Sequence, residues 1–108
     1  MSIEEIEAID AIGEDKELGA IVLTISDHLD WSKVNHLELL QEKLNTYLTF
    51  IESGELLETY PRARGKKVSI VLVYKHLPNK EGYNFLNQVS NIIENTGLQF
   101  SFKELKKT

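Results

Sequence analysis

The sequence predicts an α+β fold: a two-layer sandwich in the order ββαβαβ, with a four-stranded mixed sheet and two helices on one face. Three observations predict it. Short β-branched runs bounded by turn residues alternate with two long stretches of helical periodicity. The chain has 108 residues, the size of one domain, so we expect a single domain over residues 1–108. Right-handed crossovers between parallel strands would place both helices on the same face.

The first two strands form an antiparallel pair in this prediction. The isoleucines from position 3 to position 12 recur every three residues, which by itself suggests a helix. We nevertheless predict a strand over residues 6–12, because the turn-rich residues 13–19 separate it from a second β-branched run at residues 20–26. The alternation of the second strand turns one set of apolar residues inward, namely Ile21, Leu23 and Ile25.

A helical period follows, with leucine or isoleucine at positions 37, 40, 44, 48 and 51. It predicts a helix from residue 31 to residue 53, with Gly54 supplying the positive φ at its end. Asp30 is the predicted N-cap, because Leu29 and Val34 then occupy the two positions of a hydrophobic staple. One more helical turn is expected over residues 55–60 before Pro61.

The second half of the chain repeats the alternation of strand and helix. Residues 68–74 are apolar on both faces, which is typical of a central strand. Pro78 and Asn79 open a second helix that ends near Gly97. Residues 98–102 alternate in polarity and form the last strand. The predicted inward positions of the second helix are Phe85 or Leu86, Val89, Ile92 and Ile93.

The face of the sheet that carries no helix is a candidate contact surface. Its predicted residues are small and partly apolar, and an uncovered apolar face often binds another protein. The residues concerned are Val22, Thr24, Ser69, Val71 and Val73.

Composition limits the function classes. With 42% hydrophobic and 27% charged residues the chain is typical of a globular protein. It has no cysteine, which excludes disulfides, thiolate catalysis and zinc ribbons. The acidic N-terminus differs from a signal peptide, and no stretch approaches the ~18 apolar residues of a membrane helix. We therefore expect a cytoplasmic protein that has no membrane partner and needs no cofactor.

The formal net charge of −5 conceals a strong asymmetry. Residues 1–59 hold fourteen acidic and three basic side chains, whereas residues 60–108 hold nine basic and three acidic ones, giving formal charges of −11 and +6. We expect the two halves to interleave in the fold and to neutralise each other, because charge halves seldom form separate faces in a small domain. The alternative is a dipolar molecule with an acidic and a basic face.

A polar cluster directly follows the second strand and is the first candidate site. If residues 26–30 stay extended, His28 and Asp30 point the same way, as two metal ligands or a base and its orienting carboxylate could. His36 could reach back as a third ligand. The favoured interpretation is structural: Asp30 caps a helix, Asp27 belongs to a turn, Trp31 packs beside the helix start and His36 is partly exposed.

A basic loop is the second candidate site, consisting of Tyr60, Arg62, Arg64, Lys66 and Lys67. It could hold phosphate or RNA, with Tyr60 as a stacking platform. The favoured alternative is a solvated loop whose charges pair with Glu55, Glu58 or the acidic first helix. Nucleic-acid modules usually carry a basic excess, and this chain has a pI near 5.2, so its composition argues against a nucleic-acid partner.

Three stretches resemble a family of small bacterial proteins catalogued only as a domain of unknown function. They are residues 9–13, residues 19–31 with the string Leu-Thr-Ile-Ser-Asp-His-Leu-Asp-Trp, and residues 40–54. The resemblance covers nearly the whole chain. It implies a bacterial cytoplasmic protein and supplies no catalytic residue or cofactor.

Three candidate functions are compatible with these residues. No nucleotide-binding, zincin or hydrolase motif occurs, so the leading hypothesis is a non-enzymatic binding or regulatory module that contacts a protein partner or a second copy of itself. The second is an enzyme or metal-binding protein with its site at Asp27, His28, Asp30 and His36. The third is phosphate or RNA binding through the basic loop.

Overall fold

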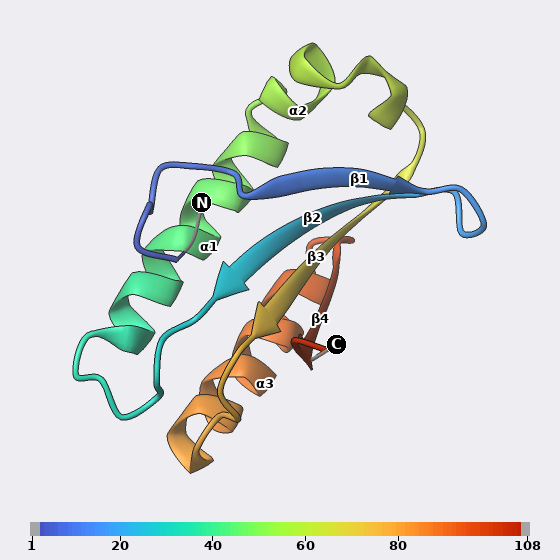
Figure 1. Ribbon diagram of the computed structural model, residues 1–108. Helices are drawn as coiled ribbons and strands as arrows, with labels where there is room; N and C mark the ends of the chain where they lie inside the picture. The colour runs from blue at the N-terminus through green and yellow to red at the C-terminus, as the bar shows by residue number, and fades with distance from the viewer. Residues whose placement is uncertain (1–2, 107–108) are drawn as a thin grey trace.

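The structure is a computed structural model that describes residues 3–106, and it consists of one sheet covered on one face by helices (Figure 1). The predicted α+β class, the mixed four-stranded sheet and the order ββαβαβ are confirmed. The helical turn expected over residues 55–60 is present as α2, and only the short 3-10 helix η1 adds to the predicted elements. The elements are β1 (Ala11–Asp15), β2 (Ala20–Asp27), α1 (His36–Glu52), α2 (Glu55–Thr59), η1 (Pro61–Ala63), β3 (Lys67–Tyr74), α3 (Lys80–Glu94) and β4 (Gln99–Glu104).

The strands lie in the sheet in the order of the sequence, β1-β2-β3-β4. β1 is antiparallel to β2, and β2, β3 and β4 are parallel. Consequently the two strands of the first half of the chain form one side of the sheet and the two strands of the second half form the other side, as the colours of Figure 1 show. In the sheet, the strands of the acidic half and those of the basic half therefore do not interleave, contrary to expectation. The two halves are joined by ion pairs of Glu14 with Arg62 and Lys66.

β1 begins at Ala11, so the predicted strand over residues 6–12 is wrong in its first part. The chain leaves the sheet because side chains replace the backbone ladder there. Asp10 Oδ2 accepts the backbone N–H of Ser26 at 2.9 Å, where a paired strand would present a carbonyl. The backbone N–H of Ile3 then donates to the Ser26 carbonyl at 3.0 Å. The preceding carbonyls are free to turn toward α1.

The start of α1 also differs from the prediction. α1 begins at His36, and residues 31–35 form turns instead of helix. Its N-cap is Asn35 and not Asp30. Val34 is fully exposed whereas Leu29 is buried, so the proposed staple between them does not form. The end of the helix is as predicted, since Gly54 follows the Ser53 cap with a φ of 91°.

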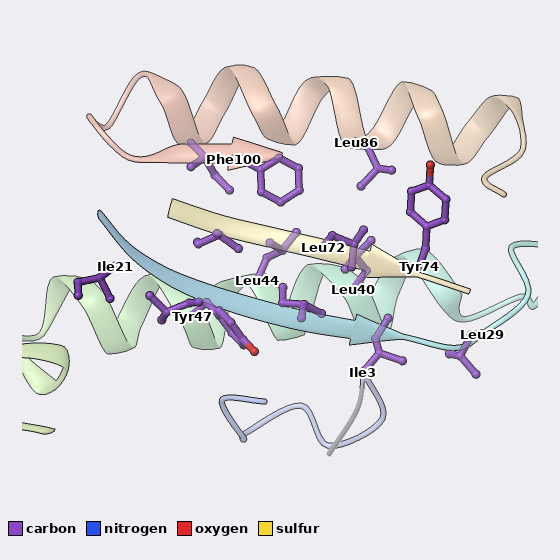
Figure 2. Close-up of a cluster of buried hydrophobic side chains, with 14 of the residues drawn as sticks. Ile3, Ile21, Leu29, Leu40, Leu44, Tyr47, Leu72, Tyr74, Leu86 and Phe100 are labelled. Atoms are coloured by element: carbon purple, nitrogen blue, oxygen red, sulfur yellow. The ribbon is translucent and has the colours of Figure 1, made fainter. Parts of the chain in front are cut away.

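The core lies between the sheet and the two long helices (Figure 2). The inward residues of β2 are those that the alternation predicts, and β3 contributes an apolar row beside them. Each fully buried aliphatic side chain stabilises the fold by about 1.5–3 kcal/mol. The fully or nearly fully buried residues of this layer are Ile21, Leu23, Ile25, Leu40, Leu44, Tyr47, Ile70, Leu72, Leu86 and Ile93.

In α3, the structure agrees with some of the predicted positions and differs at others. Leu86, not Phe85, is the fully buried member of that pair. Ile92, which was expected to face inward, is 64% exposed. The helix opens after Pro78 and Asn79, as expected, with Asn79 as the N-cap that accepts the Gly82 N–H at 2.8 Å. The helix is capped at its end by Asn95, so Gly97, with a φ of 91°, lies two residues beyond the cap.

Trp31 joins the loop after β2 to the start of α3. Its Nε1–H donates to the carbonyl of His76 at 2.8 Å. Its ring lies against Gly82, where an added Cβ would stand 2.6 Å from Trp31 Cε3 and 3.1 Å from the Cβ of Pro78. The absence of a side chain at Gly82 is therefore what lets the indole ring approach the helix.

This contact predicts that Gly82→Ala destabilises the protein, which is the opposite of the usual effect of replacing a helical glycine with alanine. Inside a helix, alanine is ordinarily about 1 kcal/mol more favourable than glycine. Here the methyl group must displace the buried indole, and we expect a loss of about 1–3 kcal/mol in the free energy of unfolding. Urea denaturation measures it, with Asn87→Ala on the exposed side of α3 as the control. Stabilisation by Gly82→Ala would show that Trp31 is not packed there.

Candidate functional site

The polar cluster after β2 is divided by the fold into a buried pair and two exposed side chains. Asp27 and His36 are buried together, whereas His28 and Asp30 are exposed. His28 Nε2 lies 3.1 Å from the carboxylate of Glu4. Within residues 3–106, no three histidine, aspartate or glutamate side chains gather in a way that could hold a metal ion. The four candidates therefore do not form one site.

The buried pair arises from the alternation of β2 and the position of the first helical residue. Asp27 ends β2 on the side that faces the helices, and His36 begins α1. His36 Nε2 is 2.6 Å from Asp27 Oδ2, and neither side chain is exposed to solvent. His36 Nδ1 lies 3.1 Å from the carbonyl of Asp30, and the Leu29 N–H donates to Asp27 Oδ1 at 3.1 Å. The expectation of a partly exposed His36 is wrong.

An imidazole held by a carboxylate is the arrangement of a general base. This imidazole, however, has no free nitrogen, because a carboxylate faces one and a backbone carbonyl faces the other. The ring of Trp31 closes the site, with its centroid 4.1 Å from that of His36. The pair therefore has the geometry to fix the loop between β2 and α1, and it presents no atom to a substrate.

Asp30 forms a turn at the surface of the same loop. Its Oδ1 accepts the backbone N–H of Ser32 at 2.9 Å and the Ser32 hydroxyl at 2.8 Å. These hydrogen bonds, the backbone one first, hold the pKa of Asp30 below its ordinary value of 3.8. Asp30 is thus a capping residue, but it caps the turn that precedes α1 and not the helix itself.

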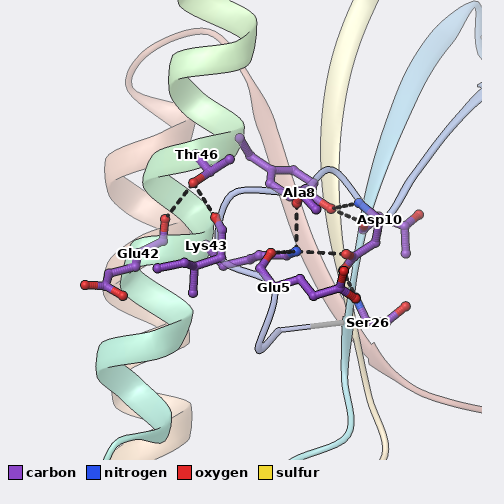
Figure 3. A network of polar contacts seen from close by, with 10 residues as sticks. Glu5, Ala8, Asp10, Ser26, Glu42, Lys43 and Thr46 are labelled. Carbon is purple, nitrogen blue, oxygen red and sulfur yellow. Dashed lines mark hydrogen bonds and ion pairs between the residues drawn. The ribbon is translucent and has the colours of Figure 1, made fainter. Parts of the chain in front are cut away.

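A second buried ion pair lies on α1 and was not predicted from the sequence. The Lys43 side chain has no exposure to solvent, and its ammonium donates to Asp10 Oδ1 at 2.8 Å (Figure 3). It also donates to the backbone carbonyls of Glu5 and Ala8, each at 2.7 Å. All three ammonium hydrogens therefore have a partner.

Tyr47, one turn further along α1, extends this network to β2. Its hydroxyl donates to the Thr24 carbonyl and accepts the backbone N–H of Asp10 at 2.8 Å. Burial raises the pKa of Tyr47 well above its ordinary value, so the hydroxyl stays protonated at neutral pH. One signal could have revealed the network: Lys43 stands three residues after Leu40 and four before Tyr47, on the apolar stripe.

The basic loop is partly neutralised by an acidic strand residue. Arg62 lies 3.1 Å from the carboxylate of Glu14, and Lys66 forms a second ion pair with the same group. The hydrogen bond from Lys66 lowers the pKa of Glu14 below its ordinary value. The predicted partners of these two bases, Glu55 and Glu58, are thus replaced by a residue of β1.

The other members of the predicted basic site differ from one another in their surroundings. Arg64 and Lys67 are exposed and form no ion pair with the residues that the structure describes. Tyr60 is partly buried and packs against the core. The loop therefore does not gather its four bases around the tyrosine ring.

Comparison with protein families matches residues 1–106 to a family described as "Family of unknown function (DUF6572)". No curated protein and no solved structure matches the chain. In the part of the chain that the structure describes, no helix combines the length and the apolar character needed to cross a membrane.

The Lys43 network predicts a large and coupled loss of stability. Lys43→Met leaves Asp10 buried without its cation, which should cost about 3–5 kcal/mol in the free energy of unfolding. Adding Asp10→Asn removes the stranded charge, so the double variant should be more stable than the two single losses imply, by about 0.5–3 kcal/mol. Urea denaturation of all four proteins gives this coupling.

Lys33→Met is the matched control, because Lys33 is exposed and its replacement should change stability by less than about 0.5 kcal/mol. Equal effects of the substitutions at Lys33 and Lys43, or strictly additive effects at Lys43 and Asp10, would contradict the structural role given to the pair.

The lowered pKa of Asp30 predicts a pH-dependent contribution. The ionised carboxylate stabilises the fold above the ordinary value of 3.8, and this contribution is lost as the pH falls through the lowered pKa. At neutral pH we expect Asp30→Ala to lower the melting temperature more than Asp30→Asn, whose amide oxygen can still accept the Ser32 N–H. The difference between wild type and Asp30→Asn should shrink below pH 3.8. An unchanged melting temperature for Asp30→Ala would refute the capping role.

Proposed function

The chain belongs to the DUF6572 family, a family of unknown function, and we propose from its own geometry that it is a non-enzymatic module that binds another protein through the uncovered face of its sheet. A bacterial cytoplasmic location, which the sequence resemblance implies, is part of this proposal.

The observation that supports the proposal is the character of the uncovered sheet face, which we call the open face. The register places small residues of all four strands next to one another on it, three of them valines, and Gln99 is a larger polar residue at the β4 side of the same face. A sheet face that only meets water does not require three valines. A face of small side chains lets another flat surface pack against it at a distance of about 10 Å. The open face consists of Ala11, Gly13, Val22, Thr24, Ser26, Ser69, Val71, Val73, Gln99 and Ser101.

The charges at the margin of the open face indicate the chemistry of the partner. Lys67 and Lys103 share this face of the sheet and are exposed. Asp15 is an acidic residue on the same side, but its Oδ1 already accepts the backbone N–H groups of Glu17 and Leu18. A second copy of this face would bring the same lysines, so the face favours a different protein with carboxylates around an apolar patch.

The buried ionisable pairs support a binding role over catalysis. The buried ionisable groups, Asp27 with His36 and Lys43 with Asp10, are closed to solvent and form ion pairs or hydrogen bonds with each other. Among the described residues, no buried side-chain nitrogen or oxygen lacks a hydrogen-bond partner. A catalytic site ordinarily leaves such a group available to its substrate. We therefore assign these buried pairs a structural role, in which they hold in place the elements that form the surface of the molecule.

Replacing Val71 with arginine tests this function. Val71 lies at the centre of the open face and is partly exposed, so Val71→Arg should fold with a nearly unchanged melting temperature while it obstructs docking. We expect the wild type to retain a partner from a lysate of its own cells that Val71→Arg does not retain. Retention should weaken with added salt, because the lysines contribute electrostatically.

Asn91→Arg is the control, since Asn91 is exposed on α3, in the helix layer on the other side of the sheet. A partner that is retained equally by wild type, Val71→Arg and Asn91→Arg would contradict binding through the open face.

A further inference from the structure

A second apolar surface lies on the opposite side of the molecule, between the two long helices. It is a groove of about 360 Å³. Its floor includes Leu44 and Ile93, which also belong to the core, and its walls are formed by further apolar side chains of α1 and α3. Ile92 stands at the groove and is 64% exposed, the residue that the helical period had placed in the core. The remaining lining residues are Gln41, Asn45, Leu48, Phe85, Gln88 and Val89.

The lining of this groove carries no charge, although 27% of the residues of the chain are charged. Its polar members are the amides of Gln41, Asn45 and Gln88, which both donate and accept hydrogen bonds. In a two-fold contact each patch faces its own copy, so a charged lining would repel itself, whereas amides can pair with amides. In a chain of net charge −5, the groove is a place where two copies can meet without repulsion.

The charges beside the groove select the orientation of the two copies. α1 carries the exposed carboxylates of Glu38, Glu42 and Glu52, while its one lysine, Lys43, is buried. A two-fold axis across the helices would place α1 against α1 and these carboxylates against one another. An axis along the groove places α1 of one copy against α3 of the other and avoids that repulsion.

We propose that the groove between α1 and α3 is a homodimer interface with its two-fold axis along the groove. Leu48 lines the α1 wall and Ile92 lines the α3 wall, so the axis brings Ile92 of each copy against Leu48 of the other. The helix layer is then buried between the copies, and both open faces remain outward. A dimer of this kind presents two binding faces, which increases the avidity for a partner that carries two matching sites.

Sedimentation equilibrium tests the interface directly. At high micromolar concentration the wild type should show a mass near twice 12.4 kDa. Ile92→Lys should raise the dissociation constant of the dimer by about thirtyfold or more, as expected for a central apolar anchor. Its melting temperature at low concentration should match that of the wild-type monomer, because Ile92 is largely exposed. Asn91→Lys, with the same charge added one residue away and outside the groove lining, should remain dimeric.

The outcomes separate this interface from the proposed function. A wild type that stays monomeric, or an Ile92→Lys variant that dimerises as well as Asn91→Lys, overturns the groove interface. A dimer that Val71→Arg dissociates and Ile92→Lys does not would also overturn it, because the open face would then join the copies. Loss of dimerisation in Ile92→Lys alone supports the groove, whether or not a partner for the open face is found.

Discussion

The buried ion pair between Lys43 and Asp10 is the interaction on which the rest of the structure depends. It draws the carbonyls of the N-terminal segment toward α1, so the chain cannot continue as a strand before Ala11. The other carboxylate oxygen of Asp10 takes the place of a strand carbonyl at Ser26. One side chain thus closes the edge of β2 and joins the sheet to the helix. Removing either partner would leave a charge in a region closed to water, which is why both are required.

The hydrophobic period predicted the elements whose burial follows directly from repeated apolar positions. β3, the body of α1 and the body of α3 are examples, because local propensity and tertiary packing agree there. The start of β1 and the start of α1 were not predictable in this way. At both places an aspartate binds a side chain outside its own element, Asp10 to Lys43 across 33 residues and Asp27 to His36 across nine, and that bond overrides the local pattern.

The four residues of the candidate cluster do not share one environment in the fold. Sequence neighbours at positions 27–30 separate in the fold, since alternation directs Asp27 toward the helices while His28 and Asp30 remain exposed. His36 joins Asp27 because it is the first helical residue, and that position depends on where the turn ends. Lys43 gave only a weak signal, because a lysine on an apolar stripe usually extends its ammonium to the surface.

Both buried pairs stabilise junctions, one between the N-terminal segment and α1, the other between β2 and α1. Each ties α1 to the part of the chain that precedes it, so the position of α1 over the sheet is fixed by polar contacts as well as by the core. α1 also forms one wall of the groove, and the strands that it covers present the open face on their other side. The polar interior therefore contributes to the shape of both surfaces, because it fixes the helix that forms the groove over the strands that form the open face.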